Sequence, residues 1–139
     1  MREFLRMADQ SATHTALSQS ATRERLSKQL GLAASSEIDV HIMSERPFVY
    51  RHQGEIIQGT IDRLVIAEQA GQRLAAEVID FKTDRLSGNR DRWIAVKESE
   101  YGSQLRDYRT AVTQCFGIPG DSITAWLLLL EADACVAVN

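Results

Sequence analysis

The sequence has 139 residues, of which 44% are hydrophobic and 25% are charged, a composition typical of one modest globular domain and not of a disordered tail. Sixteen Lys and Arg residues stand against nineteen Asp and Glu residues, so the formal net charge of -3 does not by itself indicate a nucleic-acid-binding protein. The last basic residue is Arg109, and the three acids after it (Asp121, Glu131 and Asp133) account for the whole net charge. Residues 1–109 are therefore balanced, and contact with nucleic acid is not excluded there.

Cys115 and Cys135 lie in apolar sequence without a Cys-x-x-Cys pair or a Cys/His cluster, which indicates neither a disulfide framework nor a zinc site. We therefore expect a reducing, cytoplasmic environment. The longest apolar run, Ala125–Leu130, is much shorter than the roughly 18 residues that a membrane-spanning helix needs. Residues 1–5 lack the apolar core of a signal peptide, so the sequence predicts a soluble chain with no membrane partner.

Residues 1–36 are expected to form an N-terminal helical segment ahead of a core domain over residues 37–139. Apolar residues within 4–7 and 26–32 predict two short helices, the second of which ends near Gly31. After this segment, apolar residues alternate in steps of two on both sides of a proline, which predicts one or two short strands.

Two β-rich runs within Glu55–Thr83 flank a polar segment that contains Gly71, and they predict a β-hairpin. If the turn centres near Gly71, the numbers of facing residues sum to about 142, which places Asp62 opposite Asp80, with Cβ atoms roughly 5 Å apart. Alternation places Lys82 on the same face as Asp80. The hairpin therefore predicts that three charged side chains lie close together.

After a polar loop over Arg85–Arg92, an apolar stripe from Tyr101 to Cys115 recurs every three or four residues and predicts a helix that Gly117 ends. The apolar run Ile123–Leu130 predicts a strand covered on both faces, followed by a last short strand over Cys135–Val138. We expect an α+β fold in which helices flank a mixed β-sheet.

A pair of aspartates within strongly β-forming sequence needs an explanation, because carboxylates prefer water. Two anions roughly 5 Å apart repel unless a cation lies between them, and carboxylate oxygens suit Mg²⁺ or Mn²⁺, which also bind water and phosphate oxygens. Lys82 could orient or deprotonate an attacking water, or stabilise charge on a phosphate. Asp62, Asp80 and Lys82 therefore indicate phosphodiester cleavage. The spacing allows equally that Asp62 forms a structural salt bridge with Arg63 or Lys82.

Three segments resemble successive motifs of the RecB-type nuclease domain, a member of the PD-(D/E)XK superfamily: Gly59–Arg63, Val78–Asp84 and Tyr101–Tyr108. This domain lies at the C-terminus of RecB and AddA helicase-nucleases, and the resemblance covers Glu45–Val138. It implies a restriction-endonuclease-like core in residues 37–139. It also implies metal-dependent DNA phosphodiester hydrolysis of the exonuclease V type, in double-strand break repair and recombination.

The resemblance also implies a role for each residue of the site. Asp62 matches the first metal-binding aspartate, Asp80 the acidic residue of the (D/E)XK motif, and Lys82 its catalytic lysine. The backbone carbonyl of Phe81 would complete the shell of a Mg²⁺ or Mn²⁺ ion.

Gln104 and Tyr108 match the QxxxY motif, which supports the lysine and contacts DNA, and a spacing of four places both on one helix face. For Tyr108, a plain core aromatic is an equal alternative. Basic residues after the motif could hold DNA phosphates: Arg85, Arg90, Arg92 and Lys97, with Arg106 and Arg109 beyond them. Acidic residues are interleaved with them, so a mixed solvated surface is the alternative.

Two further features concern the metal. Family members usually carry a metal-binding histidine on an upstream helix, whereas His14 lacks the neighbouring glycine of that motif, and His41 and His52 are expected in strands as ordinary polar residues. Glu45 resembles a family glutamate that precedes a Pro-Phe pair, although a solvated residue at a strand edge is the simpler interpretation. We expect a C-terminal piece of a longer helicase-nuclease that, in isolation, is weakly active or inactive.

Three hypotheses remain open. The first is a Mg²⁺-dependent deoxyribonuclease without sequence specificity, whose partners are DNA, a helicase domain of the same parent chain and a second helicase-nuclease subunit. The second is a catalytically weak or inactive module of the same fold that binds DNA or a partner subunit. The third is an unrelated α+β protein, which would place the carboxylates of Asp62 and Asp80 on opposite sheet faces.

Overall fold

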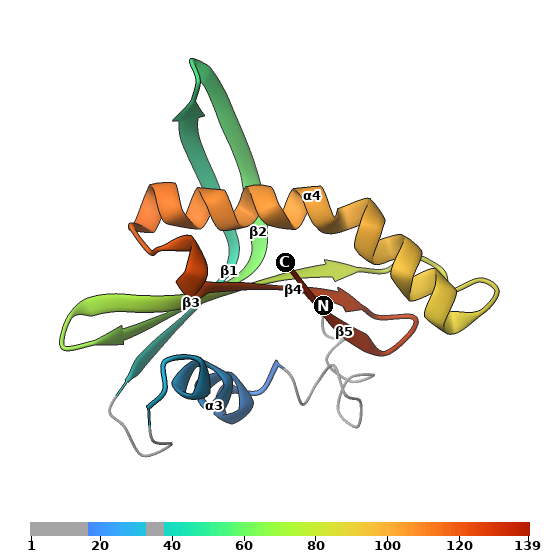
Figure 1. The fold of residues 1–139 in the computed structure, drawn as a ribbon, viewed down its shortest axis with the longest axis horizontal. Coiled ribbons are helices and arrows are strands. Elements are labelled where there is room, and N and C mark those ends of the chain that lie inside the picture. Colours follow the sequence, from blue (N-terminus) through green and yellow to red (C-terminus); the bar gives the residue numbers. More distant parts are fainter. Residues whose placement is uncertain (1–16, 33–37) are drawn as a thin grey trace.

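The computed structural model describes residues 17–32 and 38–139. In this part of the chain, a five-stranded mixed sheet in the order β1-β2-β3-β4-β5 lies between helix α3 on one face and helix α4 on the other (Figure 1). The elements are α3 (Gln19–Gln29), β1 (Asp39–His52), β2 (Glu55–Gln69), β3 (Gln72–Lys82), α4 (Arg90–Phe116), the 3₁₀ helix η2 (Gly120–Ser122), β4 (Ile123–Leu129) and β5 (Ala134–Val138). The predicted α+β class, with helices that flank a mixed sheet, is confirmed.

Strands β1, β2 and β3 are antiparallel neighbours, β4 is parallel to β3, and β5 is antiparallel to β4. A parallel pair needs a long crossover connection, and α4 provides it between β3 and β4 (Figure 1). The crossover places α4 over the sheet face that carries Asp80 and Lys82.

Each face of the sheet has its own apolar core. On the α4 face, Leu105 and Val112 of the helix pack with strand residues such as Val78 and are fully buried. On the α3 face, Leu26 is fully buried in a smaller cluster with Val65 and its neighbours. Residues 127–129 of β4 are all buried, as predicted for a strand that is covered on both faces.

The helix ends follow from local capping. Helix α4 begins at Arg90, because the side chain of Asn89 accepts a hydrogen bond from the backbone N–H of Arg92 at 3.0 Å, so the predicted loop is shorter than expected. The helix ends at Gly117, as predicted, with a φ of 71°. Cys115 is exposed and not part of the buried stripe, because Phe116 contacts the core at that turn.

Strand β1 is one continuous strand that runs through Pro47. A proline lacks the N–H of the ladder, and it is tolerated here because β1 is at the edge of the sheet. The distal part of the β1–β2 hairpin projects past α4 (Figure 1). None of the helices in the described residues is long and apolar enough to cross a membrane.

Candidate active site

The turn of the β2–β3 hairpin sets the register of the two aspartates. Ala70 and Gly71 form the two-residue turn with φ values of 52° and 76°, as a type I′ turn requires. A bulge between Ala67 and Glu68 then shifts the pairing by one residue. Beyond the bulge the pairs continue to Arg63 opposite Ile79, which confirms the predicted register.

Arg63 is the last residue of β2 that pairs with β3, and Asp62 lies directly before it in the sequence. Its Oδ2 atom accepts a hydrogen bond from the backbone N–H of Phe81 at 2.9 Å. The carboxylate therefore satisfies a strand N–H that would otherwise lack its ladder partner, and this bond holds Asp62 against β3.

The alternation of side chains along β2 also changes at Asp62. Ile61 and Leu64 pack in the same core although they are three residues apart, which strict alternation does not allow. The neighbouring strand is irregular at the same level: Glu45 has a φ of 50° and lies between two regular pairs of the β1–β2 ladder. This shared irregularity leaves Asp62 outside the ladder. Glu45 is an exposed strand residue, in keeping with its simpler interpretation.

Asp80 is buried, with 2% of its surface exposed, and the carboxyl of Asp62 lies close enough to change its pKa. Burial and the neighbouring carboxyl of Asp62 raise the pKa of Asp80 to about 6, whereas Lys82 opposes this shift. Lys82 Nζ lies 3.0 Å from Asp80 Oδ2 and forms an ion pair with it. The carboxyls of Asp62 and Asp80 therefore lie close together, and the opposite-face arrangement of the third hypothesis is not found.

Helix α4 contacts the same ammonium group of Lys82. The ammonium donates a hydrogen bond to Gln104 Oε1 at 3.1 Å, and Gln104 Nε2 donates to the phenol oxygen of Tyr108 at 2.9 Å. Tyr108 is buried, and burial together with the nearby negative charges of Asp80 and Asp62 raises its pKa to about 12. Tyr108 is therefore both a core aromatic and the last member of the Lys82–Gln104 network.

The structure adds Asp84 and Tyr101 to the surroundings of Lys82, neither of which was among the predicted catalytic residues. Lys82 Nζ lies 4.3 Å from the centre of the Tyr101 ring, a cation–π contact. The phenol of Tyr101 donates to Asp84 Oδ2 at 2.7 Å, and Lys97 pairs with the same oxygen at 2.7 Å. These two donors lower the pKa of Asp84. A sequence signal existed, because Tyr101 lies three residues before Gln104 and thus on the same helix face.

The predicted DNA-contacting residues occupy different environments. Arg90 lies in the first turn of α4 and donates two hydrogen bonds to the carbonyl of Ala132, at 3.1 and 2.8 Å, so it fastens the helix to the β4–β5 turn. Lys97 forms ion pairs with Asp84 and Glu100. Arg85 and Arg92 are exposed, and both stay candidates for phosphate contacts.

Asp62 and Asp80 are the residues that could hold a divalent metal. Mg²⁺ commonly takes one or two carboxylates and keeps several waters, and the neighbouring carboxyls of Asp62 and Asp80 provide this kind of ligand. Within the described ranges, no group of three or more His, Cys, Asp or Glu residues gathers as a metal site. The carbonyl of Phe81 as a third ligand stays a prediction.

The upstream histidine that is usual in the RecB-type family has no counterpart in a metal-binding group within the described residues. His14 lies outside the described residues. His41 is in β1, where it lies 3.3 Å from the carboxylate of Glu68, and His52 is at the exposed end of the same strand. Both are strand residues, as predicted.

No protein-family model matches the chain, and no curated protein matches it. Its function is therefore inferred from the arrangement of Asp62, Asp80 and Lys82.

Proposed function

We propose that the chain is a divalent-metal-dependent deoxyribonuclease domain of the PD-(D/E)XK type, similar to the nuclease domains of RecB and AddA. The observation that carries this proposal is that the carboxyls of Asp62 and Asp80 lie close enough to interact, with the ammonium of Lys82 3.0 Å from Asp80. A helix, three antiparallel strands, a crossover helix and a parallel strand, in this order, support a restriction-endonuclease-like core.

Asp62 and Asp80 would hold Mg²⁺ or Mn²⁺, which when bound polarises a phosphoryl oxygen and lowers the pKa of bound water. The ammonium of Lys82 then offsets negative charge on the phosphate as water attacks phosphorus and the ester P–O bond breaks. Gln104 accepts a hydrogen bond from this ammonium and restricts its position.

The wider setting is part of the same proposal. The substrate is DNA, bound through its phosphates without base recognition, and Arg85 and Arg92 are exposed cations that follow the motif in the sequence. A helicase domain of the same parent chain would deliver the strand, with a second helicase-nuclease subunit as a further partner, in the cytoplasm and in double-strand break repair.

A catalytically weak or inactive module that binds DNA or a partner subunit is the second candidate. It is favoured by one observation: the described residues supply two carboxylates but no third His, Cys, Asp or Glu ligand. Such a module would bind DNA and leave it intact in the presence of either metal.

Degradation of single-stranded and plasmid DNA with Mg²⁺ or Mn²⁺, by the domain within its full-length parent chain, tests the proposal. We expect Asp80→Ala and Lys82→Ala to lower the rate by about 10²-fold or more, because each removes a group that acts on the reacting phosphate. Asp121→Ala, which changes an exposed acid away from the site, should cleave like the unaltered chain. Unchanged cleavage by Asp80→Ala or Lys82→Ala would show that the assignment is wrong.

A further inference from the structure

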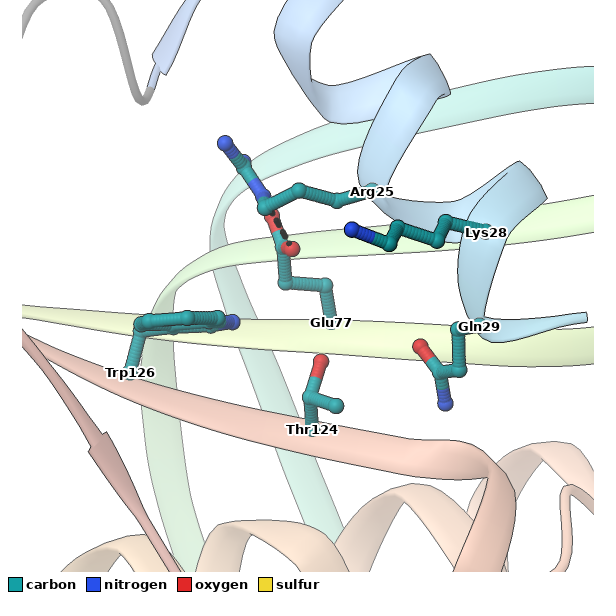
Figure 2. A pocket seen from close by; sticks show the side chains of 6 residues that line it. All are labelled: Arg25, Lys28, Gln29, Glu77, Thr124 and Trp126. Atoms are coloured by element: carbon teal, nitrogen blue, oxygen red, sulfur yellow. Dashed lines mark hydrogen bonds and ion pairs between the residues drawn. The ribbon is translucent and has the colours of Figure 1, made fainter. Parts of the chain in front are cut away.

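A second candidate site lies on the opposite face of the sheet, between α3 and strands β3 and β4. It is a pocket of about 310 Å³, within the range of about 300 to 1,000 Å³ for small-molecule pockets. Its lining consists of Arg25, Lys28, Gln29, Glu77, Thr124 and Trp126 (Figure 2). No step of the proposed nuclease chemistry uses these residues.

The negative charge in the pocket is already neutralised. Glu77 is 1% exposed, and the guanidinium of Arg25 donates hydrogen bonds to both of its carboxylate oxygens at 2.8 Å. The same guanidinium lies 6.0 Å from the centre of the Trp126 ring. Lys28 forms no ion pair with any described residue, so the lining has one positive charge in excess.

Several polar groups of the lining are unused. Trp126 Nε1 is buried and has no hydrogen-bond partner in the described part of the chain. Figure 2 shows this nitrogen, the hydroxyl of Thr124, the amide of Gln29 and the ammonium of Lys28 directed toward the space between them. A buried N–H without a partner destabilises the folded protein, and a ligand with an acceptor at this point would satisfy it.

We propose that this pocket binds a small organic anion, in which one carboxylate or phosphate group is joined to a planar or apolar portion. Lys28, Trp126 Nε1 and the Thr124 hydroxyl donate to the anionic group, and the indole face packs against the planar portion. Glu77 does not repel the anion, because Arg25 holds its charge in a two-point ion pair. The site lies on the α3 face, apart from Asp62 and Asp80, and its ligand is independent of DNA cleavage.

Calorimetric titration of the full chain at constant ionic strength tests the proposal with three probes: phenyl phosphate, phenylacetate and neutral benzyl alcohol. We expect at least one of the two anions to bind, with benzyl alcohol roughly tenfold weaker or worse. The stronger anion identifies phosphate or carboxylate as the preferred group. In a Trp93→Phe variant, which leaves Trp126 as the remaining tryptophan, binding should change the fluorescence.

Lys28→Gln and Thr124→Val should each weaken binding by roughly tenfold, and Lys28→Arg should retain it, because the donor and the charge persist. Arg51→Gln, which changes an exposed cation on the β1–β2 hairpin, should bind like the unaltered chain. Binding of neither anion, equal binding of benzyl alcohol, or full binding by Lys28→Gln and Thr124→Val would overturn the proposal. Because this measurement uses neither a divalent metal nor DNA, failure of the nuclease assignment would leave its result unaffected.

Discussion

Asp80 combines deep burial with a contact to a second carboxylate, and this combination makes the metal-free protein sensitive to pH. The pKa of Asp80 is raised from 3.8 to about 6, so between these values the folded protein keeps a proton that the unfolded chain has released. The free energy of unfolding therefore falls as pH rises through this window, and the loss is complete above it.

Asp80→Asn removes this titration. In EDTA at pH 8, we expect the variant to be more stable than the unaltered chain by on the order of 1–3 kcal/mol, because position 80 then carries no charge. Below the window the difference should disappear, since Asp80 is then protonated in both states. Urea unfolding at pH 8 and at a pH below the window measures this difference, with Asp121→Asn, a change at an exposed position, as control. An equal difference at both pH values would contradict the burial of this charge.

Gln104 acts on the reaction through Lys82 and is therefore a positioning residue. Gln104→Ala removes the acceptor that lies 3.1 Å from the ammonium, and we expect kcat for DNA cleavage to fall by about 10-fold while KM changes little. Gln114→Ala replaces an exposed glutamine on the same helix and should have no effect. A rise in KM with kcat unchanged would assign Gln104 to DNA binding.

At the scale of single elements, the β1–β2 pair depends on one glycine. A Cβ at Gly59 would lie 2.8 Å from the ring of Phe48, which packs edge-on against Tyr108 at 5.7 Å between ring centres. We expect Gly59→Ala to lower the free energy of unfolding by about 1–3 kcal/mol, because the ring must move. Thermal unfolding measures this. A Cβ at Gly120 would have no atom within 4 Å, so Gly120→Ala should lower the free energy of unfolding much less. Equal losses in the two variants would show that the Phe48 ring moves aside without cost.

The β2–β3 hairpin was predictable because its turn chemistry is local. Gly71 and the flanking β-rich runs were sufficient to place Asp62 near Asp80, and the observed pairs agree. The irregularity at Asp62 and Glu45 was not predictable, since it depends on how two strands pack beneath α4. Similarly, the start of α4 depends on the Asn89 cap, which sequence reasoning placed within a loop.

At the scale of the whole molecule, the two sheet faces contribute differently. Leu26 is the buried hydrophobic residue of α3 and packs in the cluster on this face of the sheet. We expect Leu26→Ala to cost about 2–5 kcal/mol through lost burial and a cavity, measured by chemical unfolding. Val96→Ala, which changes a 59% exposed residue of α4, is the control and should cost far less. A small cost for Leu26→Ala would show that α3 docks weakly.

The α+β class was predictable from periodicity, because Leu105, Tyr108 and Val112 mark the buried face of one helix, whereas the mixed sheet was expected from the resemblance. The meeting of Lys82 with Gln104 was not predictable from spacing, since these residues are far apart in sequence and depend on the crossover. It was expected only from the resemblance. The pocket beside Trp126 had no sequence signal, because its lining comes from three separate elements.

The most direct test of the proposed site is a calorimetric titration of the chain with Mn²⁺, which requires neither DNA nor a helicase domain. We predict saturable binding that Asp62→Ala and Asp80→Ala each weaken by roughly tenfold or more, because each removes one of two ligands. Asp121→Ala should bind Mn²⁺ like the unaltered chain. Absence of Mn²⁺ binding, or binding that survives in both Asp62→Ala and Asp80→Ala, would contradict the assignment of these aspartates to a metal site.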